Sequence, residues 1–189
     1  MGNNLENTII YLIGFGGVGK LTIATELEKL EDFRIVHNQL INNPIFSVVE
    51  KVEDQFPAYV WKKIRQIRDV VFETIKENSP QNLNFVFTNE LIEGSKGDLE
   101  LYNKVVEIAA ARGSKFVPVR LTVTDNEHRK RLVSEERKKS FKVCDESYAD
   151  RVNGSEVLKI KHRNLINIDT TLISAQESAK YILNKIKEK

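Results

Sequence analysis

The chain has 189 residues, of which 41% are apolar and 30% are charged, so we expect one domain with a hydrophobic core over residues 1–189. The 29 Lys and Arg nearly balance the 27 Asp and Glu, which gives no overall electrostatic reason to expect nucleic acid or an anionic membrane as a partner. A single cysteine, Cys144, excludes an internal disulfide and is typical of a reducing compartment, so we expect a cytoplasmic protein. The apolar segment at residues 9–13 is too short to span a bilayer.

Five short β-branched or aromatic segments predict strands, and a longer stretch with helical spacing follows each of them. The alternation predicts an α/β fold, a three-layer α/β/α sandwich around a parallel sheet, because parallel strands need long crossover connections. The five predicted strands are residues 8–13, 33–36, 84–88, 115–123 and 165–168.

Several helix ends carry recognisable capping residues. Asp98 is the predicted N-cap of one helix, Gly113 stands where a glycine would end it, and Ser174 with Glu177 reads as a capping box for the last helix. The connection at residues 38–56 is less regular. It predicts an insertion on the acceptor side of the site, with a short helix capped by Asn43 and starting at Pro44.

A glycine-rich loop, Gly-Phe-Gly-Gly-Val-Gly-Lys at residues 14–20, follows the first predicted strand and opens a helix. Its glycines fit the dinucleotide fingerprint G-x-G-x-x-G, but that reading requires an acidic residue after the second strand, where His37 and Asn38 stand. The pattern G-x-x-x-x-G-K favours a phosphate loop, in which backbone N–H groups surround a triphosphate and Lys20 reaches the terminal phosphates. The predicted nucleotide-binding residues of the loop are Gly14, Phe15, Gly16, Gly17, Val18, Gly19, Lys20, Leu21 and Thr22.

One position departs from the usual phosphate loop. The residue after Lys20 is normally a Ser or Thr that binds Mg²⁺, and here it is Leu21, with Thr22 one residue later. Adenylate kinases resemble this arrangement, with threonine in the later position. We therefore expect ATP and Mg²⁺ as cofactors, with Thr22 as the candidate metal ligand.

Five segments resemble the small P-loop kinases of the shikimate kinase, gluconate kinase and adenylate kinase type, and more closely a group of kinase-like bacterial ATP-binding proteins. The resemblance extends over nearly the whole chain. It implies the P-loop nucleoside triphosphate hydrolase fold and transfer of the γ-phosphoryl group of ATP to a small-molecule or nucleotide acceptor. The segments that carry it are residues 14–24, 37–44, 85–91, 131–137 and 168–171.

Polar residues after the second strand are the first candidates for acceptor binding. His37, Asn38 and Asn42 stand where similar kinases often place an acidic residue, and this chain has none there. They form either a hydrogen-bonding wall for the acceptor or an ordinary loop, in which asparagine is common.

Thr88, Asn89 and Glu90 end the third strand, which in similar kinases lies beside the phosphate-loop strand. Glu90 is a candidate for the base that deprotonates an acceptor hydroxyl or for the group that holds a water of Mg²⁺. The alternative is a solvated strand end.

Seven Lys and Arg lie between Arg129 and Lys142. A charged helix face explains such a run. The resemblance instead implies a lid, about residues 131–145, in which Arg137 first and then Arg131 stabilise charge on the transferring phosphoryl group. We do not expect nucleic acid here, because aromatic interleaving is limited to Phe141.

Asp169, Thr170 and Thr171 follow the last strand, where similar kinases wrap a loop around adenine. A polar strand-to-helix turn explains the same residues without a ligand.

Three functions are therefore in competition. The first is an ATP-dependent kinase acting on a small molecule or nucleotide, and the second is a nucleotide-binding or slowly hydrolysing module that signals to a partner. The third is a polynucleotide 5′-hydroxyl kinase, which needs a basic channel leading from residues 129–142 into the acceptor pocket.

Overall fold

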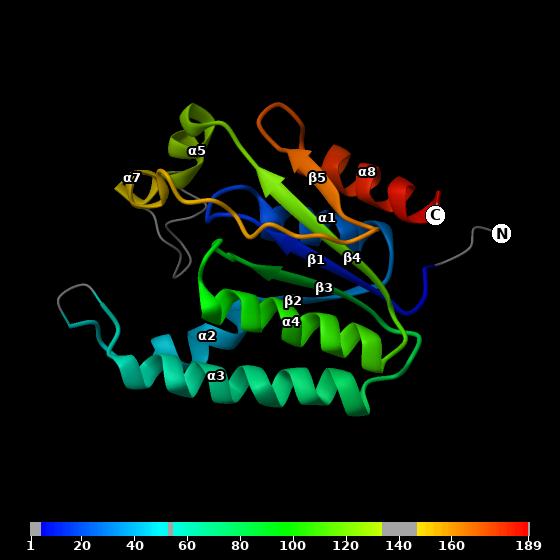
Figure 1. The fold of residues 1–189 in the computed structure, drawn as a ribbon, viewed down its shortest axis with the longest axis horizontal. Coiled ribbons are helices and arrows are strands. Elements are labelled where there is room, and N and C mark those ends of the chain that lie inside the picture. Colours follow the sequence, from blue (N-terminus) through cyan, green and yellow to red (C-terminus); the bar gives the residue numbers. More distant parts are fainter. Residues whose placement is uncertain (1–4, 53–54, 134–146, 189) are drawn as a thin grey trace.

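The structure is a computed structural model that describes residues 5–52, 55–133 and 147–188. Five parallel strands form one sheet in the order β2-β3-β1-β4-β5 (Figure 1). The α/β class and the parallel five-stranded sheet predicted from the sequence are thus confirmed. The strands are β1 (Thr8–Ile13), β2 (Phe33–His37), β3 (Asn84–Asn89), β4 (Lys115–Thr122) and β5 (Ile166–Asp169).

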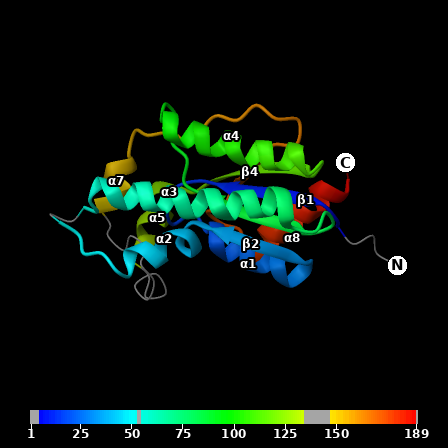
Figure 2. The same cartoon turned by 90° about the horizontal axis from the view of Figure 1, so that it is seen from below.

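Helices cover both faces of the sheet. Helices α1 (Lys20–Leu30) and α8 (Ala175–Lys187) pack together on one face, and α3 (Ala58–Glu73) and α4 (Lys96–Ala111) cover the other (Figure 2). The remaining helical elements are α2 (Asn38–Phe46), the π-helical turn η1 (Thr74–Asn78), α5 (Asp125–Leu132) and α7 (Ser147–Val152). Among the described residues, no helix has the length and apolar character needed to cross a bilayer.

The central strand β1 is buried along its whole length because both of its faces are covered. Ile9, Tyr11 and Ile13 belong to the core beneath α3 and α4, whereas Ile10 and Leu12 belong to the core beneath α1 and α8. The strand therefore reads as a continuous apolar run, and it carries the glycine loop at its carboxyl end.

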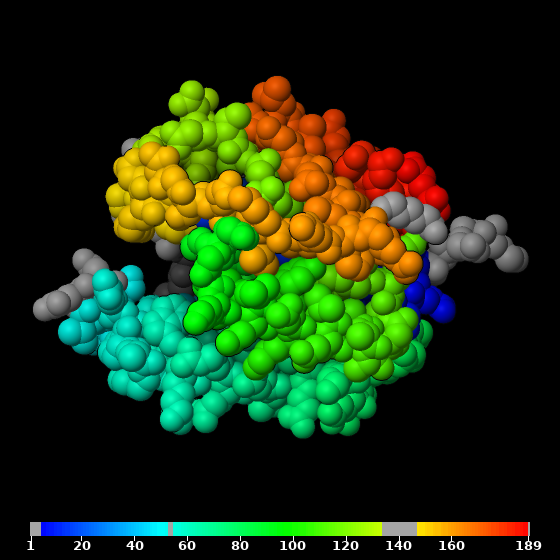
Figure 3. All heavy atoms as spheres, in the orientation of Figure 1, coloured from blue at the N-terminus to red at the C-terminus, as the bar shows by residue number. Residues whose placement is uncertain are grey.

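The segment between α7 and β5 crosses the start of α4 and the end of β4, and Figure 3 shows it lying against the connection from β3 to α4. The backbone N–H of Leu158 donates to the carbonyl of Leu91 at 3.0 Å, and Arg120 donates to the carbonyl of Val157 at 3.3 Å. These contacts hold the segment that follows α7 against the carboxyl edge of the sheet.

The structure corrects one predicted cap. The N-cap of α4 is Ser95, whose hydroxyl accepts from the backbone N–H of Asp98. Asp98 lies in the first turn instead, and its carboxylate accepts from the N–H of Ile92 at 2.9 Å. The capping box of Ser174 and the glycine end of α4 at Gly113, with φ +61°, are confirmed.

The predicted start of the short helix in the 38–56 connection is wrong. Helix α2 begins at Asn38, because the Nδ1 atom of His37 accepts from the backbone N–H of Leu40 at 3.3 Å and supplies the cap. Pro44 therefore lies inside the helix, near its end, where it removes one backbone donor.

Arg112, at the end of α4, is a buried arginine that the sequence patterns did not single out. Its two Nη atoms donate to backbone oxygens, whereas its Nε is buried without a partner among the described residues. Its guanidinium donates hydrogen bonds of 2.7–3.3 Å to four carbonyls, those of Ile75, Ser79, Pro80 and Gln81. It thereby anchors the turn that leads from η1 into β3.

Candidate active site

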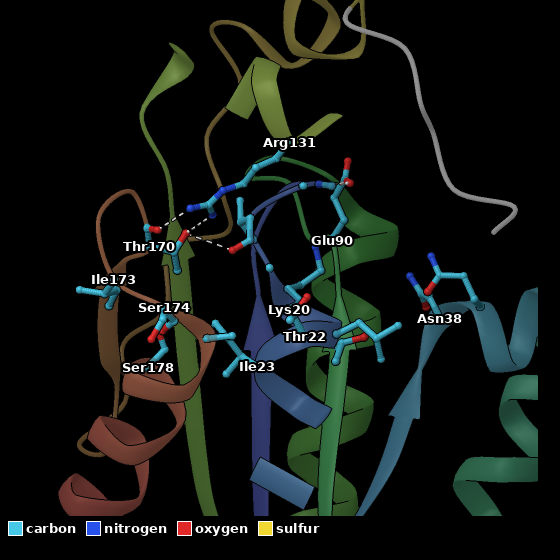
Figure 4. A pocket seen from close by; sticks show the side chains of 18 of the residues that line it. Lys20, Thr22, Ile23, Asn38, Glu90, Arg131, Thr170, Ile173, Ser174 and Ser178 are labelled. Atoms are coloured by element: carbon cyan, nitrogen blue, oxygen red, sulfur yellow. Dashed lines mark hydrogen bonds between the residues drawn. The ribbon is translucent and has the colours of Figure 1, made fainter. Parts of the chain in front are cut away.

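A cavity of about 550 Å³ opens at the carboxyl edge of the sheet, around the N-terminus of α1 (Figure 4). Side chains and backbone from six segments that are far apart in the sequence converge on it. The lining residues are Gly16, Gly17, Val18, Gly19, Lys20, Leu21, Thr22, Ile23, Asn38, Gln39, Thr88, Glu90, Arg131, Tyr148, Thr170, Ile173, Ser174, Ala175 and Ser178.

The glycines of the loop are required by its shape. Gly17 and Gly19 have φ of +97° and +96°, a left-handed conformation that L side chains rarely adopt. A Cβ atom on Gly14 would lie 2.7 Å from the carbonyl oxygen of Leu121. The compact loop leaves the first turn of α1 without a side-chain cap at Gly19, and the N-terminus of a helix favours an anion.

Lys20 lies within the curve of this loop. Its ammonium donates to the carbonyl of Gly14 at 2.6 Å and to that of Phe15 at 2.8 Å. Gly14 and Phe15 thus hold the lysine rather than line the cavity, whereas the other predicted loop residues, 16–22, do line it. The arrangement places a positive charge beside the donors of the α1 N-terminus.

Glu90 faces the loop, and it is not a solvated strand end. Its Oε2 accepts from the backbone N–H of Gly16 at 3.0 Å and from the hydroxyl of Tyr148. The same Gly16 N–H lies 3.0 Å from the Tyr148 hydroxyl oxygen. Tyr148 was missed by the sequence reasoning, because it lies on the short helix α7, far along the chain, with no motif around it.

His128 also contacts the loop and was also missed. It is buried on α5, and its Nε2 lies 2.5 Å from the carbonyl oxygen of Gly16. A Cβ on Gly17 would come within 3.0 Å of the His128 ring. The signal in the sequence was a lone histidine on a charged helix. The peptide of Gly16 is therefore held from both sides.

Arg131 lies on the β5 side of the loop. Its guanidinium donates to the hydroxyl of Thr170 at 3.0 Å and to the carbonyl of Thr170 at 2.7 Å, and it pairs with Glu127 at 2.8 Å. Arg137 and most of the predicted lid, residues 134–145, lie outside the described residues.

Thr170 lines the cavity, and its hydroxyl lies 3.1 Å from the carbonyl oxygen of Val18. Asp169 and Thr171 bond to each other instead: the Thr171 hydroxyl and backbone N–H donate to Asp169 and hold the pKa of that carboxyl below its ordinary value. Of the three predicted residues of this turn, Thr170 is thus the one whose position faces the glycine loop.

On the opposite, β2 side, Asn38 and Thr88 line the cavity. Asn89 is buried behind them: its amide donates to Asn38 Oδ1 at 2.6 Å, and its Oδ1 accepts from the Tyr11 hydroxyl at 3.0 Å. Figure 4 shows Arg131 and Thr170 to one side of Lys20 and Asn38 to the other, with Glu90 between them.

The remaining predicted acceptor residues lie apart from this cavity. His37 caps α2 and lines a second cavity, of about 420 Å³, whose other lining residues belong to α2 and its end. Asn42 lies on α2, and its buried Oδ1 lacks a hydrogen-bond partner among the described residues.

For Mg²⁺, the cavity offers oxygen ligands of the kind that ion prefers: the hydroxyl of Thr22 and the carboxylate of Glu90. Leu21 offers none. Within the described ranges, no group of three or more His, Cys, Asp or Glu is arranged to hold a metal ion alone. These residues fit a metal that is also bound by the phosphates of a nucleotide.

The sheet is parallel in the order β2-β3-β1-β4-β5, and a glycine-rich loop joins its central strand to helix α1. No protein-family model and no curated protein matches the chain. Solved structures do. A candidate kinase from Chloroflexus aurantiacus is 12% identical, with a TM-score of 0.66 and 99% of each chain covered.

Two further structures extend the comparison. A gluconokinase from Sinorhizobium meliloti is 9% identical, with a TM-score of 0.58, covering 98% of this chain and 94% of the gluconokinase. The Mycobacterium tuberculosis APS kinase CysC, solved with AMPPNP and APS, is 12% identical, with a TM-score of 0.57, covering 96% of this chain and 98% of CysC. At such low identity the shared property is the fold, which agrees with the resemblance inferred from the sequence.

Proposed function

We propose that the protein is an ATP-dependent kinase that transfers the γ-phosphoryl group to a hydroxyl or phosphate of a small molecule or nucleotide. One observation carries the proposal: the glycine loop opens into a cavity that has Arg131 and Thr170 on one side and Asn38 and Thr88 on the other, with Glu90 between them. A nucleotide and a second substrate need two such compartments meeting at the terminal phosphate.

The nucleotide is assigned to the compartment on the β5 side. The N–H groups of residues 16–22 and the ammonium of Lys20 supply donors and positive charge for its phosphates. Arg131 and Thr170 border the nucleoside. Mg²⁺, with Thr22 and Glu90 as the nearest protein oxygens, would neutralise charge on the phosphates.

The acceptor is assigned to the compartment on the β2 side, with Asn38 and Thr88 as its polar wall. Glu90 is the carboxylate at the junction of the two compartments. As the acceptor oxygen forms its bond to phosphorus and the bond from phosphorus to the leaving ADP oxygen breaks, Glu90 takes the proton of the acceptor hydroxyl. Arg137 remains the proposed lid arginine.

A small acceptor is preferred over a polynucleotide because the described arginines of the basic segment are engaged with acids. Arg129 pairs with Asp125 at 3.1 Å and Asp150 at 2.7 Å, and Arg131 pairs with Glu127. Such pairing reduces the positive potential that a phosphate backbone requires.

The test is a transfer assay with ATP that carries ¹⁸O in its γ-phosphoryl group, a cellular metabolite pool and a 5′-hydroxyl oligonucleotide, read by mass spectrometry. The proposal predicts a labelled phosphorylated metabolite that is absent with Lys20→Ala. Label found only in inorganic phosphate would support the hydrolysing module instead, and label on the oligonucleotide would support the polynucleotide kinase.

A further inference from the structure

Tyr148 lines the cavity, and the proposed function leaves it without a role. It is a buried residue of α7, and its hydroxyl lies at the glycine loop. That hydroxyl donates to Glu90 Oε2, and its oxygen lies 3.0 Å from the backbone nitrogen of Gly16. Glu90 Oε2 lies 3.0 Å from the same nitrogen. One N–H group of the loop is therefore shared by two acceptors that are hydrogen-bonded to each other.

Packing between α5 and α7 fixes the ring of Tyr148 in this place (Figure 1). The ring meets that of His128 edge to face, with the two centroids 6.1 Å apart, and Leu132 and Ala149 are buried in the same cluster. His128 itself contacts the carbonyl of Gly16 at 2.5 Å. The hydroxyl is thus held at the loop by a packed ring, not by a freely rotating surface side chain.

The N–H of Gly16 belongs to the end of the loop that lies beside Lys20. The ammonium of Lys20 donates to the carbonyls of Gly14 and Phe15, the two residues that precede Gly16. In a phosphate loop the lysine reaches the terminal phosphates, whereas the N–H groups nearer the helix surround the inner ones. A nucleoside triphosphate bound here would therefore bring the oxygens of its last phosphate to the Gly16 N–H.

The Glu90 carboxylate already lies in that place. The carboxylate and a terminal phosphate need the same hydrogen of Gly16, and two anions at one donor repel each other. The carboxylate must therefore leave the loop when a triphosphate binds, and for this its hydrogen bond with the Tyr148 hydroxyl must break. A nucleoside diphosphate ends one phosphate earlier and leaves Glu90 and Tyr148 in place.

We propose that Tyr148 is a positioning residue that holds Glu90 on the loop until the terminal phosphate of ATP displaces it. Displacement frees the carboxylate for the acceptor compartment, where Glu90 is proposed to take the proton of the acceptor hydroxyl. The base thus becomes available only when a phosphoryl group is present to be transferred. This inference rests on the proposed binding of ATP at the loop, and its test does not depend on turnover.

The first test compares the ATP analogue AMPPNP with ADP, both with Mg²⁺, in calorimetric titrations of wild type and Tyr148→Phe. The phenylalanine keeps the ring packed against α5 and removes only the hydroxyl. We expect Tyr148→Phe to bind AMPPNP about tenfold more tightly, the lower end of the effect of losing a hydrogen bond to a charged group, and to bind ADP as wild type does. Tyr59→Phe, at an exposed position of α3, is the control and should change neither affinity.

The second test observes the hydroxyl group directly. The ¹³Cζ signal of Tyr148, assigned by its absence from Tyr148→Phe, reports on the hydrogen bond between the hydroxyl and Glu90. We expect AMPPNP with Mg²⁺ to shift this signal, and ADP with Mg²⁺ to leave it near its position in the free protein. A tyrosine with a structural role alone would respond to both nucleotides in the same way.

Three results would overturn the role of Tyr148. Weaker AMPPNP binding by Tyr148→Phe would mean that the hydroxyl binds the nucleotide itself. The same change in affinity for AMPPNP and ADP, or no change for either, would mean that the hydroxyl does not hold Glu90 against the terminal phosphate. A ¹³Cζ signal that AMPPNP leaves unshifted would mean that the hydroxyl stays on Glu90 when the triphosphate binds.

The kinase proposal fails separately. Tighter binding of AMPPNP but not of ADP by Tyr148→Phe, without transfer from ATP to any acceptor, would keep the role of Tyr148 at the loop and remove the kinase. Transfer by a wild-type protein whose affinities for AMPPNP and ADP equal those of Tyr148→Phe would keep the kinase and overturn the role of Tyr148.

Discussion

Replacing Glu90 by glutamine separates its contact with the glycine loop from its proposed role as the base for the acceptor. The carboxylate accepts the N–H of Gly16 at 3.0 Å, and that N–H belongs to the loop proposed to bind phosphate. ATP must therefore take this donor from Glu90. The amide keeps the shape of the side chain and loses its charge and most of its basicity.

We expect Glu90→Gln to strengthen ATP binding and to slow phosphoryl transfer. A hydrogen bond to a charged acceptor contributes about 1.5–3 kcal/mol and one to a neutral acceptor about 0.5–1.5 kcal/mol. The bond that ATP displaces is thus weaker by about 1 kcal/mol in Glu90→Gln, which predicts roughly fivefold tighter ATP binding. Loss of a positioned base slows transfer by about 10²- to 10⁴-fold.

Calorimetry with a nonhydrolysable ATP analogue measures the affinity, and single-turnover transfer to the identified acceptor measures the chemistry. Glu100→Gln, on the exposed side of α4, is the matched control and should change neither. Wild-type transfer with weakened ATP binding would refute the reasoning, because Glu90 would then serve the nucleotide or its metal rather than the acceptor.

Three further predictions concern stability and nucleotide choice. Arg112→Met should lower stability by about 3 kcal/mol and the Tm by roughly 6–12 °C in calorimetric unfolding, because four carbonyls lose their donor. The exposed Arg34→Met is the control, and equal Tm values in the two variants would contradict the account. Gly17→Ala forces alanine to φ +97° and should lower the free energy of unfolding by about 1–2 kcal/mol. The control Gly97→Ala, in a helix with open space around it, should not lower stability. A Gly17→Ala variant that is as stable as wild type and binds ATP normally would argue against the loop geometry. NAD and NADP should not compete with ATP at micromolar concentration, because no acid follows β2 to hold a ribose, and effective competition would revive the dinucleotide reading.

Much of this arrangement was predictable because its causes are local. Consecutive residues form the apolar run of β1 and the glycine loop with its positive φ angles. The strand, the loop and the start of α1 could therefore be predicted from the sequence. Asn38, Thr88 and Thr170 all stand at or just after the carboxyl ends of parallel strands, so the strand order places the first two on one side of the cavity and Thr170 on the other.

The rest depends on contacts between distant segments. His128 and Tyr148 reach Gly16 only because α5 and α7 fold back over the loop, and no local pattern reports that path. The start of α2 was missed because a histidine, an uncommon cap, takes the place of Ser or Asp.

The central claim is that this loop binds ATP through Lys20. Calorimetric titration of the wild-type protein with ATP and Mg²⁺, beside Lys20→Ala and the exposed control Lys29→Ala, tests it most directly. The account predicts saturable binding at one site, unchanged in Lys29→Ala and at least about tenfold weaker in Lys20→Ala, because an ammonium beside the phosphates is lost. Equal affinity in all three proteins, or no binding by the wild type, would contradict it.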